Sequence, residues 1–413
     1  MAPRSQLARS INILRDDGSL FKLRTYNAIS PVGLDRFPRG QYEVSSDANN
    51  AKAIMLRSHK LQDEEVEETV RGIARCGAGV NNIPVDRMTE RGICVFNTPG
   101  SNANAVKELA VCGMLLCSRG IAQGAQWSVT HEQTDEDQFA KDVETAKKQF
   151  GGMELKGKTL GVVGLGNIGA AVAEAACSLG MSALCYDPHL TLEAAFSLDP
   201  TRMTRVESLE AVLSGSDFVT LHVPYIPDAT HHLLNAERLK LMKPGAHILN
   251  FSRGGLVDED ALQERLDGSA TGMYCTDFPS LKLRNHDQVI SLPHLGASTE
   301  EAEEQSAAMA AEQLVAFLEH GSIVNSVNFP TLQVAPLKEN RQRLCLANVN
   351  EEGVLSKITS ALSGFNIAKM FNKSKGSVAY TIVDVEGEVT DDVIEEIESS
   401  TQILTVRVIR NEG

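Results

Sequence analysis

Short apolar runs alternate with helical patterns along the first quarter of the chain. The runs are INIL (11–14), AKAIML (51–56), GIARCGAG (72–79) and GICVFNTPG (92–100). Because such alternation is typical of strand–helix–strand units, it predicts a parallel sheet. Apolar positions then recur at helical spacing over 101–120, which predicts one long helix capped by Ser101 or Asn102. The polar stretch 126–150 is predicted to be an exposed excursion.

A second series of apolar runs fills residues 156–299. Six runs read as strands: TLGVVGLG, SALCYD, FVTLHVP, AHILNFS, GMYCTDF and VISLPH. Six parallel strands in one segment are what a complete doubly wound nucleotide-binding sheet requires. The pattern therefore predicts a second α/β domain.

The last part of the chain has a different order of elements. A Glu-rich helix is predicted over 298–320, and a short connector with two prolines follows it. From about 342 to 410 the predicted elements are RLCLANV, a helix over 353–363, NIAKMFNKS, VAYTIVDVEG, a helix through Ile394, and ILTVRVIR. This βαββαβ order predicts a ferredoxin-like module.

Composition excludes several classes of function. The formal net charge of −15 argues against a nucleic-acid surface, which needs clustered Lys and Arg. No apolar run approaches the ~20 residues of a membrane span, and the start MAPRSQLARS lacks the apolar core of a secretory signal. The eight cysteines are scattered without a C-x-x-C pair. We expect them to be free, buried thiols, such as Cys112 and Cys177, in a cytoplasmic protein without a metal site.

A glycine-rich turn carries the first chemical signal. The strand TLGVV runs into Gly164-Leu165-Gly166-Asn167-Ile168-Gly169, and a helical pattern follows. The first glycine permits a tight turn, the second lets a pyrophosphate approach the backbone, and the third lets helix and strand pack closely.

Asp187 ends the next predicted strand. A carboxylate there accepts hydrogen bonds from ribose hydroxyls and repels a 2′-phosphate, so the sequence predicts NAD rather than NADP as cofactor. The alternative is a glycine turn without ligand, with Asp187 at the surface.

Further motifs resemble those of the D-2-hydroxyacid dehydrogenases. They are CGAGVNNI (76–83), NTPGSNANAVKELA (97–110), LHVP (221–224), LMKPGAHILNFSRGGLVDEDAL (241–262) and PHLGAST (293–299). The resemblance implies a Rossmann-type doubly wound sheet (105–298) inserted into a flavodoxin-like α/β substrate domain (1–104 and 299–330), with the active site in the cleft. SVNFP (326–330) and the C-terminal module (340–413) resemble family members that carry a ferredoxin-like ACT regulatory domain. A homodimer or homotetramer is also implied.

The resemblance assigns the chemistry to three residues at predicted strand ends. Arg253 would bind the substrate carboxylate and polarise the C2 oxygen, and His294 would transfer the hydroxyl proton. Asp277 would bind the nicotinamide carboxamide. A surface arginine, a structural histidine and a turn-capping aspartate are the alternative interpretations. Further cofactor contacts are implied for His222, Val223, Pro224, Phe251, Ser252, Gly296 and Ala297.

One departure from the family pattern concerns the partner of His294. Family members usually carry a glutamate there that supports the imidazolium, but this chain reads TDFPSLKLRN. Asp287, Glu300 and Glu301 remain as candidate partners. A weaker partner would lower the pKa of the histidine.

The resemblance also implies a substrate. Arg57, Ser58 and Lys60 would bind a phosphate, with solvated surface charge as the alternative. By the same resemblance, the loop amides of Ala78 and Gly79, together with Asn102, would hold the carboxylate. The substrate implied is 3-phosphoglycerate, oxidised with NAD to 3-phosphohydroxypyruvate at the start of serine biosynthesis. The alternatives are a glyoxylate or hydroxypyruvate reductase and an NAD-sensing corepressor without turnover.

The C-terminal module carries three candidate regulatory residues. Asn350 and Asn366 match positions that bind L-serine between two subunits in ACT-containing relatives, and Asn348 stands where those relatives usually carry a histidine. Glu351 and Glu352 would repel the carboxylate of an amino acid, so a purely oligomerising module is the alternative.

Overall fold

The computed structural model describes residues 20–189, 199 and 201–410. The chain divides into two compact units, an inserted unit (Asn102–Ala302) and a terminal unit (Met1–Ser101 with Glu303–Gly413). The predicted strand INIL and the segment MAPRSQLARS lie outside the described residues. Within the described residues, no helix combines the length and the apolar character that crossing a membrane requires.

The first sheet of the terminal unit has five parallel strands in the order β2-β1-β3-β4-β5. This is the flavodoxin-like order, so the predicted fold of this region is confirmed, although the apolar runs do not predict β1 and β2. Its strands are β1 (Phe21–Tyr26), β2 (Tyr42–Ser45), β3 (Ala53–Leu56), β4 (Gly72–Arg75) and β5 (Cys94–Phe96). Its helices are α1 (Pro31–Leu34), η1 (Asp63–Glu65), α2 (Val85–Glu90) and α11 (Glu300–His320).

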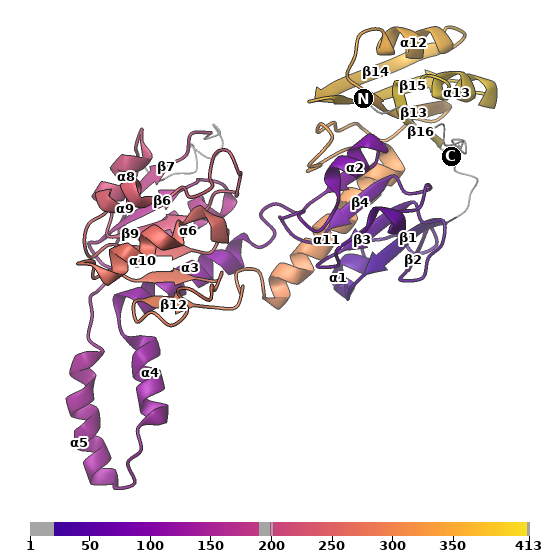
Figure 1. The fold of residues 1–413 in the computed structure, drawn as a ribbon. Helices are drawn as coiled ribbons and strands as arrows, with labels where there is room; N and C mark the ends of the chain where they lie inside the picture. The colour runs from indigo at the N-terminus through magenta and orange to yellow at the C-terminus, as the bar shows by residue number, and fades with distance from the viewer. Residues whose placement is uncertain (1–19, 190–198, 200, 411–413) are drawn as a thin grey trace. The chain divides into compact units, whose positions relative to one another are not determined.

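The C-terminal sheet is antiparallel, with the order β14-β15-β13-β16 (Figure 1). The ferredoxin-like prediction is therefore confirmed as a fold. Its elements are β13 (Arg341–Val349), α12 (Val354–Ala361), β14 (Asn366–Lys375), β15 (Val378–Glu386), α13 (Asp391–Glu398) and β16 (Ile403–Arg410). One hydrophobic core joins this sheet to α12 and α13, and a second core joins it to α11 and to the first sheet.

Two buried arginines of the C-terminal sheet bind the end of α11. Arg407 donates to the carbonyl oxygens of Phe317 and Leu318 at 2.5 and 3.0 Å, and Arg343 donates to that of His320 at 2.8 Å. The last carbonyls of a helix lack intrahelical partners and carry partial negative charge, so cations stabilise them. These contacts fix the C-terminal sheet on the helix.

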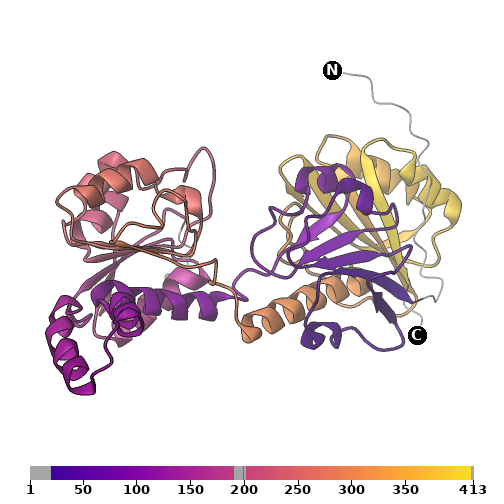
Figure 2. The ribbon, with the colours of Figure 1, turned by 60° about the horizontal axis from the view of Figure 1, so that its bottom comes forward.

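The inserted unit is built on seven parallel strands in the order β12-β11-β10-β9-β6-β7-β8. Figure 2 shows helices on both sides of this sheet. The six predicted strands are present and confirm the doubly wound sheet, and β8 is a seventh. The strands are β6 (Thr159–Val163), β7 (Ser182–Tyr186), β8 (Met203–Arg205), β9 (Phe218–Leu221), β10 (His247–Asn250), β11 (Tyr274–Thr276) and β12 (Val289–Ser291). The strand order reverses between β6 and β9, and such a switch point is where open α/β sheets bind ligands.

Helices cover both faces of this sheet. They are α3 (Ala103–Ser118), α6 (Asn167–Ser178), α8 (Leu209–Gly215), α9 (Ala236–Leu241), η3 (Gly254–Leu256) and α10 (Glu259–Asp267). The predicted long helix is α3, with Asn102 at its N-cap position. One prediction is wrong: Cys112 is exposed, because α3 turns Gly113 and Met114, not Cys112, toward the core.

The excursion after α3 is a helical hairpin. It consists of α4 (Ile121–Thr130), α5 (Glu136–Ala146) and η2 (Lys147–Gln149), and it stands away from the sheet of its own unit (Figure 1). Trp127 stacks on His131 and Phe139, with ring centroids 4.6 and 6.3 Å apart. The hairpin thus has a small aromatic core of its own.

Candidate functional site

The glycine turn after β6 leaves open space at one of its three glycines. A Cβ on Gly164, whose φ is +93°, would lie 2.6 Å from the carbonyl oxygen of His222. A Cβ on Gly169 would lie 1.9 Å from the carbonyl oxygen of Gly164. A Cβ on Gly166 would meet nothing within 4 Å. The outer glycines are therefore required by packing, whereas Gly166 keeps a backbone surface free for a pyrophosphate.

Asp187 is held beside this turn by backbone amides. Its two carboxylate oxygens accept hydrogen bonds from the amides of Leu165 and His189, each at 2.8 Å. Asn167 and Ile168 form the first turn of α6, whose free amides point toward the turn. The arrangement fits a dinucleotide, with the pyrophosphate at the helix start and a ribose at the carboxylate.

Residues 221–224 (LHVP), at the end of the neighbouring strand β9, lie beside the glycine turn after β6 and contact it. The amide of His222 donates to Val163 at 2.8 Å, and its Nε2 lies 2.9 Å from Thr220 Oγ1. Burial lowers the pKa of the His222 imidazole to about 4, so it is neutral near pH 7. Val223 accepts a hydrogen bond from Ser252 Oγ at 2.6 Å, which ties the end of β9 to the end of β10. Pro224 follows, exposed.

Arg253 lies just beyond β10 with a fixed backbone and an exposed side chain. Its carbonyl oxygen accepts a hydrogen bond from Asn250 Nδ2 at 2.8 Å, and its Nη1 donates to Ser252 at 2.6 Å. Phe251 is buried beneath it. The guanidinium is therefore available to an anion at the carboxyl edge of the sheet.

Asp277 is fully buried at the end of β11, yet one of its oxygens has no hydrogen-bond partner among the described residues. Oδ2 accepts a hydrogen bond from the amide of Gly296 at 2.9 Å, whereas Oδ1 is buried without a hydrogen bond. Burial raises the pKa of Asp277, and the positive charges of His294 and Arg253 oppose this shift. A buried acceptor without a partner is costly, so the site fits a ligand donor such as a carboxamide.

His294 is positioned through the same aspartate. Its amide donates to the carbonyl oxygen of Asp277 at 2.9 Å, and its φ of 44° turns the chain back over β11. The imidazole lies against the ring of Phe278, with centroids 4.8 Å apart. Gly296 is buried and Ala297 exposed beside it. The structure thus brings Arg253, Asp277 and His294 to one edge of one sheet.

The structure does not provide the missing acidic partner. Within the described residues, the imidazole of His294 forms no hydrogen bond with Asp287, Glu300 or Glu301. Asp287 is exposed in the loop before β12. The ring that contacts the imidazole is that of Phe278, which is apolar and cannot accept a proton.

The predicted phosphate-binding loop follows β3 in the terminal unit. The amides of Ser58 and His59 donate to Asn27 Oδ1 at 3.0 and 2.7 Å, which fixes the loop. Lys60 is exposed. The guanidinium of Arg57 forms an ion pair with Glu303 of α11, a contact that sequence reasoning missed. Glu303 stands in a run of similar glutamates, and nothing in the sequence distinguishes it from them.

The loop after β4 lies at the same edge of this sheet. Gly77 donates to Thr98 Oγ1 at 2.7 Å, and the carbonyl oxygen of Ala78 accepts from Asn97 Nδ2 at 2.6 Å. The amides of Ala78 and Gly79 donate no hydrogen bond within the described residues. Such consecutive free amides suit an anion. Asn102 belongs to the inserted unit, where its Oδ1 is buried without a hydrogen bond.

The three candidate regulatory asparagines do not meet within one chain. Asn348 is buried, and its Oδ1 accepts from Thr381 Oγ1 at 2.9 Å. Asn350 donates to the carbonyl oxygen of Gly376, in the turn between β14 and β15, at 3.1 Å. Asn366 begins β14, at the opposite end of that strand. A ligand that contacts both Asn350 and Asn366 therefore needs a second copy of the sheet.

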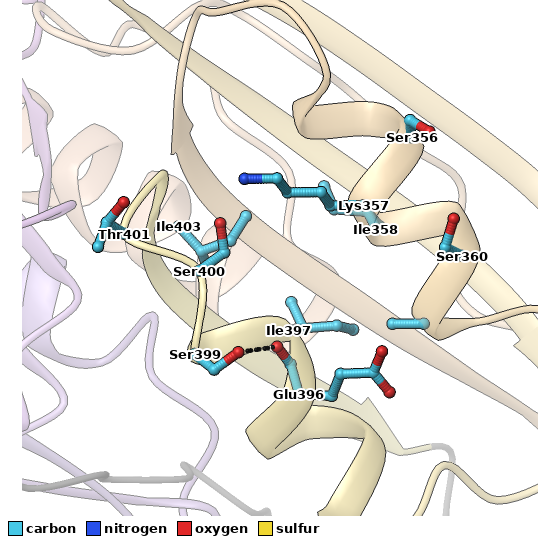
Figure 3. A pocket seen from close by; sticks show the side chains of 11 residues that line it. Ser356, Lys357, Ile358, Ser360, Glu396, Ile397, Ser399, Ser400, Thr401 and Ile403 are labelled. Atoms are coloured by element: carbon cyan, nitrogen blue, oxygen red, sulfur yellow. Dashed lines mark hydrogen bonds between the residues drawn. The ribbon is translucent and has the colours of Figure 1, made fainter.

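A groove of about 510 Å³ lies on the helical face of the C-terminal module, between α12 and α13 (Figure 3). Hydroxyl side chains, including Ser356, Ser360 and Thr401, alternate along it with the charges of Lys357 and Glu396. None of the three candidate regulatory asparagines lines it.

The inserted unit combines a strand, a glycine turn and a helix with a carboxylate at the end of the next strand and a buried aspartate after β11. These features define it as a dinucleotide-binding domain. Comparison with known sequences agrees: residues 111–296 match the model of the D-isomer specific 2-hydroxyacid dehydrogenase, NAD binding domain. The cofactor of this domain is NAD.

Similar proteins extend the match over most of the chain. A D-3-phosphoglycerate dehydrogenase of Haemophilus influenzae is 32% identical over 389 residues, covering 89% of this chain and 88% of that protein. Another, of Synechocystis sp., is 35% identical over 380 residues, covering 87% of this chain but only 65% of that protein. The chain thus spans less than two thirds of the length of that relative. It belongs to the D-isomer specific 2-hydroxyacid dehydrogenase family.

A solved structure shows the same fold. The NAD+-bound 3-phosphoglycerate dehydrogenase of Entamoeba histolytica superposes with a TM-score of 0.59 at 24% sequence identity, covering 76% of this chain and 100% of that one.

Proposed function

We propose that this protein oxidises 3-phospho-D-glycerate to 3-phosphohydroxypyruvate, with NAD as the hydride acceptor. The observation that carries the proposal is the convergence of Arg253, Asp277 and His294 on the carboxyl edge of the inserted sheet. An arginine, a buried carboxylate with an open oxygen and a histidine are the groups that oxidation of a 2-hydroxy acid needs. NAD supplies the acceptor for the hydride.

Each residue has a role that follows from its environment. Arg253 binds the substrate carboxylate and polarises the C2 oxygen, because its guanidinium is exposed and always charged. His294 accepts the proton of the C2 hydroxyl, because an imidazole nitrogen can take up a proton from a substrate and return it. Asp277 orients the nicotinamide through its free Oδ1. The remaining residues that we place in the cofactor site near these groups are Phe251, Ser252, Gly296 and Ala297.

The choice of the phosphorylated acid rests on the terminal unit and on the relatives. Arg57, Ser58 and Lys60 offer a cation and a fixed loop for the phosphate, and the amides of Ala78 and Gly79 offer donors for the carboxylate. Two relatives that match most of this chain are phosphoglycerate dehydrogenases, which favours this substrate over glyoxylate or hydroxypyruvate and over a corepressor without turnover.

We also propose that the C-terminal module acts as an ACT domain and that L-serine is its effector. We propose that the protein forms a homodimer or homotetramer. The positions of Asn350 and Asn366 at opposite ends of β14 support a site shared by two copies. The eight free cysteines support a reducing compartment, which we propose to be the cytoplasm.

The test of the proposed function is NADH formation from NAD with 3-phosphoglycerate at alkaline pH with a product trap. Phosphate-free D-glycerate, assayed in parallel, is the matched control. We expect turnover with the phosphorylated acid and little with D-glycerate. NAD binding without turnover on either acid would contradict the proposal and favour a sensing role.

A further inference from the structure

The ion pair between Arg57 and Glu303 occupies the guanidinium that is assigned to the substrate phosphate. The two side chains are 38% and 39% exposed, so the pair is partly shielded from water but open to a ligand. Glu303 comes from the first turn of α11, whereas Arg57 comes from the end of β3. Both residues belong to the terminal unit.

The main chain of Arg57 is fixed independently of Glu303. Its carbonyl oxygen accepts hydrogen bonds from Arg75 Nε at 3.2 Å and from Asn82 Nδ2 at 3.1 Å. The amides of the next two residues are bound by Asn27. Glu303 is therefore not needed to form the loop, and its effect is confined to the charge and the direction of the guanidinium.

The negative charge of Glu303 is also stabilised when its carboxylate is not paired with Arg57. It lies in the first helical turn, where the free amides and the helix dipole stabilise a negative charge. The helix itself is anchored further along, by the hydrogen bond of 2.7 Å between Ser306 Oγ and Ser101 Oγ and by the core around Ala307. The carboxylate can thus swing away without displacing the helix.

We propose that Glu303 is a specificity-determining residue that competes with the substrate phosphate for Arg57. This inference rests on the proposed function. A phosphate monoester carries about −1.5 to −2 charges near neutral pH and displaces a single carboxylate, whereas an uncharged hydroxymethyl group does not. While the phosphate is absent, Glu303 neutralises Arg57 and withholds it from weaker anions.

The charge of Glu303 must then weaken phosphate binding. Exposed ion pairs have small free energies, so the competition lowers the affinity by up to about fivefold. Removing the carboxylate while keeping the shape, as in Glu303→Gln, frees Arg57. We expect the KM for 3-phosphoglycerate to fall about three- to fivefold, with kcat and the KM for NAD changed less than about twofold.

The experiment compares Glu303→Gln with Glu304→Gln, a matched loss of one charge on the next residue of α11. We expect Glu304→Gln to change the KM for 3-phosphoglycerate less than about twofold, because a long-range charge effect is screened. In the background of Arg57→Ala, Glu303→Gln should have no further effect. The inference would be overturned if Glu303→Gln and Glu304→Gln changed the KM for 3-phosphoglycerate equally, or if this KM were unchanged or raised in Glu303→Gln.

A binding measurement separates this inference from the proposed function. Inorganic phosphate, titrated into the full chain by calorimetry, should bind Glu303→Gln about three- to fivefold more tightly than the unsubstituted chain. If neither protein oxidises 3-phosphoglycerate but phosphate binding strengthens, the proposed reaction fails and the competition stands. If the reaction proceeds while phosphate binding and KM are the same in both, the competition fails and the reaction stands.

Discussion

A buried charged residue of the C-terminal sheet and one of the nucleotide-binding sheet differ in how completely they are hydrogen-bonded. Arg343 in the C-terminal sheet is 1% exposed, and its Nε and Nη2 donate to both carboxylate oxygens of Asp384, at 2.6 and 2.9 Å. Asp277 in the nucleotide-binding sheet is 0% exposed, and one of its oxygens has no hydrogen bond. The complete pairing of Arg343 identifies a structural contact, whereas we interpret the open acceptor of Asp277, beside Arg253 and His294, as a place for a ligand.

The largest expected effect comes from breaking the complete pair. Arg343→Met leaves Asp384 buried without its partner and should lower the free energy of unfolding by about 3–5 kcal/mol. Denaturant unfolding measures this. The double variant Arg343→Met with Asp384→Leu is the control, and it should be less destabilised than the single one because no charge is left unpaired. A loss below about 1 kcal/mol in the single variant would contradict the comparison.

Removing the imidazole at the other sheet should affect turnover and leave stability unchanged. His294→Ala should lower kcat about 100-fold or more, because the C2 hydroxyl loses its base. The side chain is exposed, so the free energy of unfolding should change little. Steady-state kinetics and denaturant unfolding on the same preparation check both parts. An effect on kcat below about threefold in a folded variant would remove His294 from this role.

The glycine turn allows a matched pair of substitutions. Gly166→Ala places a methyl group into open space, so it should leave folding intact and raise the KM for NAD about tenfold. Gly169→Ala places the same group 1.9 Å from the carbonyl oxygen of Gly164 and should destabilise the inserted unit. Thermal unfolding and NAD titration separate the two. Equal loss of stability in both variants would mean that Gly166 is a packing residue.

The smallest expected effect concerns the open carboxylate itself. Burial raises the pKa of Asp277, so the folded state favours the protonated carboxyl, and ionisation destabilises the fold as the pH rises above the ordinary value. Asp277→Asn should therefore stabilise the protein by about 1 kcal/mol near pH 7. The gain should vanish near pH 3, below the ordinary pKa of about 3.9. Unfolding at both pH values is the measurement, and a gain of equal size at both would contradict this account.

The same variant should lose cofactor binding. An amide at position 277 offers the nicotinamide carboxamide a changed set of donors and acceptors, so the KM for NAD should rise while stability increases. A rise in stability together with a loss of binding would identify Asp277 as a residue kept for its ligand.

The sequence by itself determined the doubly wound sheet, its glycine turn and the ferredoxin-like module. Local signals suffice for these, because strand periodicity and glycine spacing depend on neighbouring residues. The same signals placed Arg253, Asp277 and His294 at strand ends, and parallel strands bring their carboxyl ends to one edge. The predicted strand ends, together with the family resemblance, therefore indicated these three residues as one candidate site.

Other features depended on the tertiary structure. The pairing of Arg57 with Glu303 joins residues 246 positions apart, and the pattern of α11 offers several equivalent glutamates. The exposure of Cys112 depended on which side of α3 packs against the sheet, and the apolar composition of that helix does not reveal it. The open oxygen of Asp277 exists because this residue after β11 is buried, while a single amide, that of Gly296 in the segment after β12, donates to its carboxylate. Local periodicity determines elements, but long-range packing decides which charged groups find partners.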